Sequence, residues 1–235
     1  MSDEIREILT HGEITVEARF ANSSNATLLV TVELEGTAMQ AVYKPEQGER
    51  PLWDFPSGLW RREVAAWVVS ESLALDLVPC TVERGDDAPF GPGSLQRFVD
   101  EDEENHYFTL RDDPLHAQTM RDLAAFDVVT NNSDRKSGHV LHVGGRLWAI
   151  DHGLCFHEEN KLRTVIWDFA GDELGLRLRE SLERFRHEPP TRLGELISPE
   201  EFAQTLRRAT ALLEAGSLPF PDEEGDYPPY PWPLV

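Results

Sequence analysis

The sequence has few cysteines and no long apolar run, and each shortage excludes a class of protein. Its 235 residues include only two cysteines, Cys80 and Cys155, which lie far apart. Such a pair makes neither a disulfide framework nor a cysteine metal site, so a reducing compartment fits best. No apolar run is long enough to span a bilayer, and the first residues are charged where a signal peptide would be apolar. We therefore expect a soluble, cytoplasmic protein without stable membrane insertion.

Basic residues are also scarce. The chain has 22 Lys and Arg against 43 Asp and Glu, which gives a formal net charge of -21. This charge repels nucleic-acid backbones and anionic lipid surfaces at long range, so we predict no nucleic-acid partner. Only Lys44, Lys136 and Lys161 are lysines in a chain that otherwise uses arginine, which makes Lys44 informative.

The hydrophobic content of 40% is enough for one domain with a proper core, and we treat residues 1–235 as that domain. Alternating apolar residues predict three strands between residues 13 and 44, interrupted by a small polar break at residues 21–26. Residues 61–75 predict a buried helix. Two more strands are expected at residues 79–83 and 94–99.

The second half of the chain is mainly helical in its pattern. Apolar residues recur at helical spacing over residues 114–129, and further helices are expected at residues 173–186, 192–197 and 202–215. Ser198 followed by Pro199 is typical of a helix start. The tail, residues 219–235, has six prolines and several aromatic residues, and it should lie on the body as an extended strap.

Residues 126–156 concentrate polar residues that a fold does not need. Asp134 lies in a polar loop at a predicted helix end, and Asp151 directly follows a strand-like segment. An acidic residue at a strand end can direct its carboxylate into a cleft, with the nearby Gly153 relaxing the backbone. A hairpin with its turn at Gly144-Gly145 would fold the two aspartates beside each other. In phosphoryl transfer, one such carboxylate orients the attacking hydroxyl and the other holds a metal.

These motifs resemble those of a known family. Asn-Ser-Asp-Arg at residues 132–135 and Ile-Asp-His-Gly-Leu-Cys-Phe at residues 150–156 are similar to segments of type II phosphatidylinositol 4-kinases. They are more similar still to small actinobacterial proteins described as phosphatidylinositol 3-/4-kinase-like. Residues 41–45 match the strand that carries the ATP lysine, residues 62–66 the helix glutamate, and residues 93–99 the strand leading to the hinge. The resemblance covers roughly residues 13–170.

The resemblance implies an α+β, two-lobed protein-kinase-like fold with the nucleotide between the lobes. The small N-lobe, about residues 1–99, would contain an antiparallel sheet and one helix, and the mainly helical C-lobe would span about residues 100–235. The implied activity is ATP-dependent phosphotransfer to a hydroxyl. Lys44 would contact the phosphates and Glu63 would orient it, while Asp134 would position the acceptor hydroxyl and Asp151 would hold Mg²⁺ or Mn²⁺.

The remaining nucleotide contacts are expected from two segments. The polar break would wrap phosphate oxygens, with Ser23, Ser24 and Asn25 as its candidate residues. In the hinge strand, the backbone of Gln96, Phe98 and Val99 would face the adenine edge. Each of these assignments has a simpler alternative without a nucleotide. The polar break could be an ordinary hairpin loop, Lys44 could extend along apolar surface to water, and Glu63 could be a solvated surface residue.

One position departs from the family pattern. Where the family has a metal-binding Asn, five residues after the catalytic Asp, this chain has His139. Imidazole is a poor ligand for Mg²⁺ and suits Mn²⁺ or Zn²⁺ better. The chain is therefore either an active kinase, a nucleotide-binding pseudokinase that acts as a scaffold or regulator, or a nucleotidyl transferase on the same fold. The acceptor stays open between an inositol-like small molecule, a lipid headgroup and a protein.

Overall fold

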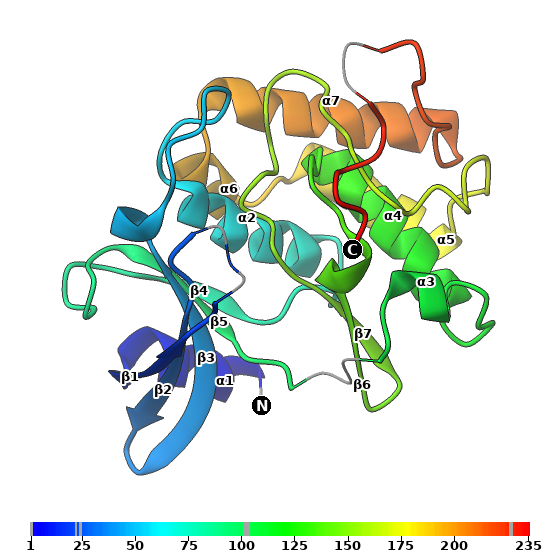
Figure 1. Cartoon of the computed structure of the whole chain (residues 1–235). Helices are drawn as coiled ribbons and strands as arrows, with labels where there is room; N and C mark the ends of the chain where they lie inside the picture. Colours follow the sequence, from blue (N-terminus) through cyan, green and yellow to red (C-terminus); the bar gives the residue numbers. More distant parts are fainter. Residues whose placement is uncertain (1, 22, 24, 101–103, 226–227) are drawn as a thin grey trace.

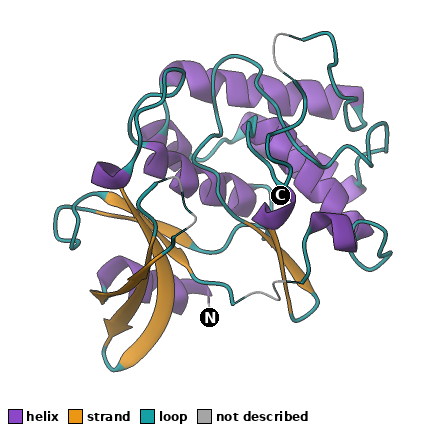
Figure 2. Cartoon of the chain, viewed as in Figure 1, coloured by secondary structure: helices purple, strands orange, loops and turns teal. Residues whose placement is uncertain are grey.

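The computed structural model describes the chain except for residues 1, 22, 24, 101–103 and 226–227. Strands gather in one part of the molecule and most helices in the other, as Figures 1 and 2 show. The buried apolar side chains likewise form two clusters, one under the larger sheet and one among the helices. The two-lobed α+β architecture that the sequence predicts is confirmed.

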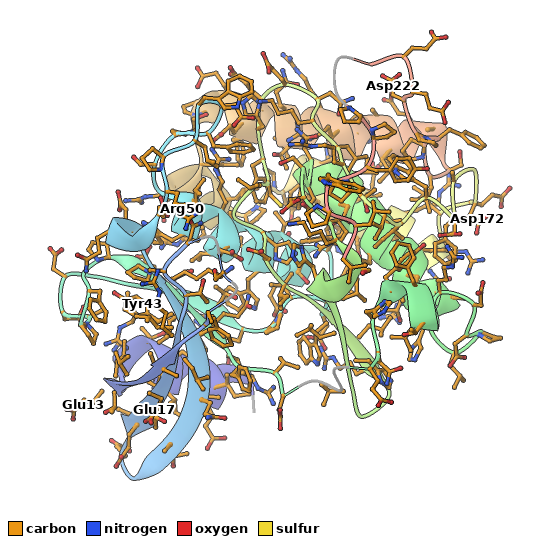
Figure 3. The ribbon with its side chains drawn as sticks, viewed as in Figure 1. Glu13, Glu17, Tyr43, Arg50, Asp172 and Asp222 are labelled. Atoms are coloured by element: carbon orange, nitrogen blue, oxygen red, sulfur yellow. The ribbon has the colours of Figure 1, made fainter. Side chains whose placement is uncertain are left out.

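The larger sheet has five antiparallel strands in the order β1-β2-β3-β5-β4. Their bounds are β1 Glu13–Arg19, β2 Leu28–Leu34, β3 Thr37–Pro45, β4 Thr81–Arg84 and β5 Gly93–Arg97. In β2, Leu28, Val30 and Val32 point into the core because side chains alternate along a strand. The edge strand β1 instead carries exposed acids such as Glu13 and Glu17 (Figure 3), which discourage pairing with another chain.

Two helices pack near this sheet, whereas the sequence predicts one. Helix α1, Ser2–His11, buries Ile8 and Leu9 against the sheet. Arg84 holds its C-terminal end by donating to the carbonyls of Leu9 (3.1 Å) and Gly12 (2.9 Å). The few apolar residues of α1 lie among charged residues, so the helical spacing of its apolar face does not stand out in the sequence.

Helix α2, Leu59–Ser72, is the predicted buried helix and lies between the sheet and the helices (Figure 1). Its apolar side chains, including Val64 and Val69, join the core of the helical lobe. Arg62 strengthens this attachment, because it pairs with Glu201 and donates to the Cys155 carbonyl at 2.6 Å. The helix that carries Glu63 is therefore anchored to the lobe across the cleft.

The helical lobe is built from five helices and a hairpin in the described part of the chain. The helices are α3 Tyr107–Leu110, α4 Ala117–Thr130, α5 Leu176–His187, α6 Thr191–Leu196 and α7 Pro199–Ala215. The hairpin consists of β6 Val140–Val143 and β7 Arg146–Ala149, with two short 3-10 turns elsewhere, η1 Glu46–Gly48 and η2 Ser137–His139. As expected, Ser198 caps α7 in a capping box with Glu201, and Gly216 ends it.

The tail after α7 crosses the helical lobe as the predicted extended strap (Figure 1). The Pro229 carbonyl accepts from the Thr164 amide and the Trp167 indole, both at 3.0 Å. The Leu234 carbonyl accepts from the Ser137 amide at 2.9 Å, so the strap reaches the loop that follows α4. Among the described residues, no helix is long and apolar enough to cross a membrane.

Candidate functional site

Lys44 lies at the end of β3 and reaches across the cleft. Its ammonium donates to Glu63 Oε1 from α2 and to Asp151 Oδ1, at 2.9 Å, from the end of the hairpin. Burial by itself would lower the pKa of Lys44, but the Asp151 and Glu63 carboxylates outweigh it and raise that pKa above its usual range. The predicted Lys44–Glu63 ion pair is present, and Asp151 joins it.

Asp151 follows β7 in a left-handed backbone conformation, with φ of 61°. Asp tolerates this region better than most residues, so the turn needs no glycine at this point. Gly153, two residues further on, does not have a positive φ, so Asp151 itself makes the left-handed turn and the backbone role expected of Gly153 stays a prediction. The Lys44 ammonium holds the pKa of Asp151 well below its usual range, against the opposing effect of burial. The side chain is half-exposed and faces the same cavity as Lys44.

Asp134 lies in the loop between α4 and η2, on the helical side of the cavity. Its amide donates to Asn132 Oδ1 at 3.0 Å, and its carboxylate accepts from Lys136 Nζ at 2.9 Å. Burial raises the pKa of Asp134, and the Lys136 ammonium partly offsets that rise. The β6–β7 hairpin folds back as predicted, so Asp134 and Asp151 line one cavity.

A buried ion pair holds the loop of Asp134 in shape. Asp127 on α4 is fully buried and accepts from Arg135, Asn132 and Thr164 at 3.0–3.1 Å. Arg135 also donates to the Ile150 carbonyl at 2.8 Å, next to Asp151. Asp127 is thus a structural residue that is bound to the loop.

His139 closes the helical side of the site. Its Nε2 lies 3.5 Å from Asp151 Oδ2, and its Nδ1 accepts from the Lys136 amide, also at 3.5 Å. Burial lowers the pKa of His139 to about 4, although Asp151 pulls it upward, so the ring is neutral at pH 7. Because Nδ1 is an acceptor in this arrangement, the ring proton lies on Nε2 and faces Asp151.

The cavity between these groups has a volume of about 290 Å³. Ser23 and Asn25 line it and Ser24 lies outside the described residues, so the contact of this segment with phosphate stays a prediction. The lining also includes Glu49 and Arg50, which sequence reading missed. Glu49 accepts from the Gly58 and Trp60 amides at 2.8 Å and so caps the start of α2.

The predicted hinge residues Gln96, Phe98 and Val99 do not line this cavity. The buried Gln96 side chain donates to Thr81 Oγ1 at 2.8 Å. The Phe98 amide donates to the Gln40 carbonyl at 3.1 Å, so this backbone donor already has a partner. Contact of these residues with a nucleotide stays a prediction.

The donor set suits a metal that is shared with a bound anion. Among the described residues, no group of three His, Cys, Asp or Glu side chains converges to hold a metal ion by itself. Asp151 offers a hard carboxylate oxygen, the kind of ligand that Mg²⁺ and Mn²⁺ prefer. Residues and nucleotide phosphates commonly share such ions. Asp151 therefore fits the implied metal as a partial site.

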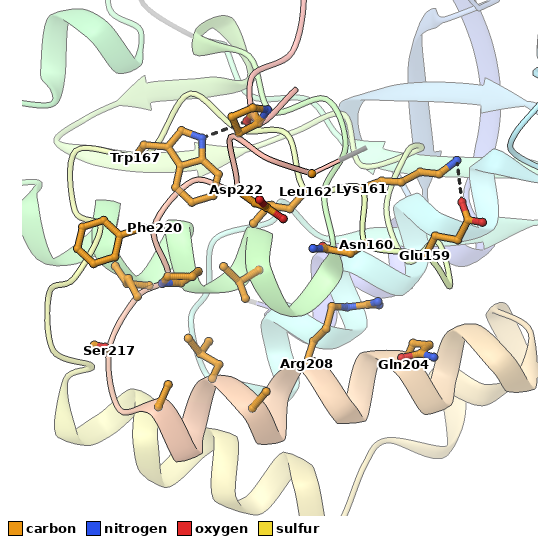
Figure 4. A pocket seen from close by; sticks show the side chains of 18 of the residues that line it. Glu159, Asn160, Lys161, Leu162, Trp167, Gln204, Arg208, Ser217, Phe220 and Asp222 are labelled. Carbon is orange, nitrogen blue, oxygen red and sulfur yellow. Dashed lines mark hydrogen bonds and ion pairs between the residues drawn. The ribbon is translucent and has the colours of Figure 1, made fainter. Parts of the chain in front are cut away.

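A larger cavity, of about 880 Å³, lies between α7, the loop at residues 158–162 and the tail (Figure 4). Arg208 there donates to the carbonyls of Val129 and His157 and to Thr205 Oγ1, at 3.1–3.2 Å. Lys161 is paired with Asp54 at 3.0 Å. Both cations of the described lining are thus already engaged, Lys161 by a carboxylate and Arg208 by neutral oxygens, and the smaller cavity is the better candidate site.

Comparison with known proteins supports the fold. No family model matches the chain. The Helicobacter pylori proinflammatory kinase CtkA has a similar structure, with a TM-score of 0.52 and 12% identity over 89% of this chain and 94% of CtkA. Hydra Fam20, in a structure with sugar, gives a TM-score of 0.59 and 10% identity over 91% of this chain and 87% of Fam20. At these identities the likeness shows a protein-kinase-like fold and does not extend to the phosphatidylinositol 4-kinases.

One curated protein is similar in sequence along its whole length. Protein Rv2133c of Mycobacterium tuberculosis is 35% identical over 276 aligned positions, which cover 99% of this chain and 96% of Rv2133c. Identity at this level over nearly complete chains is well above that of the two structural neighbours. The protein therefore belongs to the same family as Protein Rv2133c of Mycobacterium tuberculosis.

Proposed function

We propose that this protein is an ATP-dependent phosphotransferase that acts on a hydroxyl group. The observation that carries the proposal is the convergence on one ammonium, Lys44, of carboxylates from α2 and from the end of β7, in a cavity that also contains Asp134. Kinases use a strand lysine paired with a helix glutamate, a metal-binding aspartate and a second aspartate at the acceptor hydroxyl. The kinase-like structural neighbours support the same reaction class.

The charge of the cavity explains why a divalent cation belongs to the reaction. The lining has four carboxylates, on Glu49, Glu63, Asp134 and Asp151, and two cations, on Lys44 and Arg50, so its formal charge is 2 - 4 = -2. The negative charge of this surface would repel a nucleoside triphosphate. A metal bound by Asp151 and the phosphates would offset that repulsion and polarise the transferred phosphoryl group.

We assign the chain's own groups to the following roles. Lys44, oriented by Glu63, binds the nucleotide phosphates, and the Asp134 carboxylate accepts the proton of the acceptor hydroxyl. The acceptor oxygen then bonds to the γ-phosphorus while the bond from that phosphorus to the β–γ bridging oxygen breaks, and ADP leaves with the electron pair. Burial favours this proton transfer because it raises the pKa of Asp134 and makes the carboxylate a better base.

His139 is proposed as the second metal ligand beside Asp151. Its 3.5 Å distance to Asp151 is compatible with a shared ion after the ring proton moves from Nε2 to Nδ1. The hydrogen bond that would be lost, from the Lys136 amide, is long at 3.5 Å, so its loss costs little. This arrangement predicts a preference for Mn²⁺ over Mg²⁺.

The acceptor class is best approached through small polyols. The Fam20 structure was determined with a sugar, and the proposed base Asp134 faces a cavity of about 290 Å³, large enough for a compact hydroxylated ring. A protein hydroxyl is the other class, because the Asp151 side chain is half-exposed and leaves the mouth of the cavity open to a large substrate. A panel of polyols and a casein-type protein substrate therefore covers both classes.

The test combines binding, turnover and product mass. Wild-type protein should show an increase in melting temperature with ATP and Mn²⁺ or Mg²⁺, and it should convert ATP to ADP in the presence of an acceptor. Intact-mass analysis distinguishes added phosphate from added AMP, which would indicate a nucleotidyl transferase. Asp134→Ala should keep the thermal shift and lose the transfer. Loss of both in that variant would contradict the assignment of Asp134 as the base.

A second candidate is a nucleotide-binding pseudokinase. It is favoured by His139 in place of the amide ligand and by the Lys136 ammonium, which occupies the Asp134 carboxylate at 2.9 Å. A pseudokinase would give the thermal shift with ATP but no ADP with any acceptor or metal. Restoration of turnover by His139→Asn would show that only the metal site separates the chain from an active kinase.

A further inference from the structure

His152 connects the two walls of the site. It follows Asp151 directly, and its side chain is completely buried beneath the cavity. Its ring packs edge-on against Phe126 of α4, with ring centroids 5.5 Å apart and planes at 89°. An imidazole that only filled space at this position would make apolar contacts alone, whereas His152 also makes polar contacts on two sides.

On one side the ring meets Arg135. His152 Nε2 lies 2.8 Å from an Arg135 guanidinium nitrogen. Since a guanidinium can only donate, Nε2 must accept, and the ring proton is therefore on Nδ1. The same guanidinium is fixed by Asp127, and its backbone neighbour is the proposed base Asp134. His152 is thus tied to the acceptor-side loop.

On the other side His152 meets Glu63. The His152 amide donates to Glu63 Oε2 at 2.9 Å, while Glu63 Oε1 accepts from Lys44. The Nδ1–H group points to the same carboxylate at 3.9 Å and has no hydrogen-bond partner among the described residues. A buried donor without a partner is costly, so its position beside Glu63 needs a reason.

We infer that His152 is a positioning residue that couples the acceptor-side loop to the Lys44–Glu63 pair. Arg135 fixes the ring, the ring fixes the backbone amide, and the amide holds Glu63 in the rotamer that orients Lys44. The order of contacts is Arg135, His152, Glu63 and Lys44. The catalytic consequence of this coupling rests on the proposed function, but the geometric consequence at Lys44 does not.

Three substitutions of His152 distinguish the contribution of the ring's shape from that of the hydrogen bond that Nε2 accepts from Arg135. His152→Gln places an amide oxygen close to the position of Nε2, so it can still accept from Arg135. His152→Asn has its amide oxygen near the Nδ1 position and cannot reach Arg135. His152→Phe keeps the ring contact with Phe126 but has no acceptor. The inference predicts that the Gln variant resembles the wild type and that the other two do not.

The scarcity of lysine supplies a readout that needs no nucleotide. The chain has only Lys44, Lys136 and Lys161, so the rate of amine acylation at each can be followed by mass spectrometry of peptides. We expect His152→Phe and His152→Asn to increase the acylation rate of Lys44 about fivefold, which corresponds to about 1 kcal/mol, because Glu63 releases it. His152→Gln should leave the rate unchanged. Lys161, paired with Asp54, is the internal reference.

A double-mutant cycle tests the route through Glu63. If His152 acts on Lys44 through Glu63, then His152→Phe should add nothing to the acylation rate in a Glu63→Gln background. Additive increases would overturn the inference, as would an unchanged Lys44 rate in His152→Phe. An equal increase at Lys161 would also overturn it, because it would indicate general loosening of the fold.

Turnover measurements separate this inference from the proposed function. With ATP and Mn²⁺, His152→Phe should lower kcat about tenfold with a smaller change in KM, and His152→Gln should restore most of it. Equal kcat in the wild type and His152→Phe would overturn the coupling. Wild-type protein without any ATP-dependent thermal shift or turnover would contradict the proposed function, and the acylation result would still decide the role of His152.

Discussion

The larger and the smaller of the cavities described above differ in chemistry as well as in size. The larger one, about 880 Å³, has a mixed lining of apolar, neutral polar and acidic residues, and its two cations, Lys161 and Arg208, are already engaged by neighbouring groups. The smaller one, about 290 Å³, gathers Lys44, Glu63, Asp134 and Asp151 from elements that are far apart in sequence. Convergence of charged groups with shifted pKa values is a better indicator of function than volume. The smaller cavity is therefore the functional candidate.

Two arginines, the fully buried Arg135 and the partly buried Arg208, show the same difference in the walls. Arg135, beside the smaller cavity, is paired with the fully buried carboxylate of Asp127. Arg208, beside the larger cavity, donates only to neutral oxygens, and burial lowers its pKa to about 10. Hydrogen bonds between two charged groups hold a loop in one arrangement, because each is stronger than a hydrogen bond to a neutral oxygen. The wall of the smaller cavity is thus built for fixed geometry.

The largest effect is expected from Asp151→Asn. The substitution keeps the shape of the side chain and removes the charge that opposes a metal cation. We expect metal-dependent ATP turnover to fall about 100-fold or more, with a melting temperature close to that of the wild type. Steady-state kinetics and thermal unfolding check both parts. Unchanged metal-dependent ATP affinity would remove Asp151 from the metal role.

The next effect concerns stability. Asp127→Ala leaves Arg135 buried without its carboxylate, which should cost about 3–5 kcal/mol in the free energy of unfolding. Arg208→Met is the matched change at the larger cavity, and it should cost less, because it removes a charge together with its hydrogen bonds and leaves only neutral carbonyl and hydroxyl oxygens without that donor. Urea denaturation measures both. If Asp127→Ala lowers the free energy of unfolding less than Arg208→Met does, the wall of the smaller cavity is not the more firmly fixed of the two.

A graded effect is expected at His139. If the ring ligates the metal, the wild type should prefer Mn²⁺ over Mg²⁺, and His139→Asn should shift the ratio of activities toward Mg²⁺ about tenfold, since an amide oxygen is a harder ligand. The activity ratio with the two metals is the measurement. An unchanged ratio would mean that His139 only hydrogen-bonds Asp151.

The smallest effect is expected at the larger cavity. The side chains of Asn160 and Gln204 line it (Figure 4), and neither residue lines the smaller cavity that contains Lys44. The double variant Asn160→Ala, Gln204→Ala should show the wild-type ATP-dependent thermal shift and turnover. A tenfold loss of turnover, about 1.4 kcal/mol, would show that the larger cavity takes part in substrate binding.

Much of the local structure could be predicted from the sequence. Period-two alternation gave β2 and β3, helical spacing gave α2 and α4, and Ser198-Pro199 marked the start of α7. Helix α1 was missed because charged residues obscure its apolar face. In the sequence, Lys136 stands out only as one of three lysines, and no local motif indicates that it pairs with Asp134.

The residue types that are available for chemistry, and the order of the elements that carry them, can be read from the amino-acid sequence without a structure. Glycine pairs, capping residues and apolar periods act over a few residues, so they can be read without a structure. The tertiary structure alone decided which of those side chains meet. Lys44 contacts Asp151 across 107 residues of sequence, and His152 contacts Glu63 across 89. Such contacts depend on how the two lobes pack through α2, and no local pattern encodes that packing.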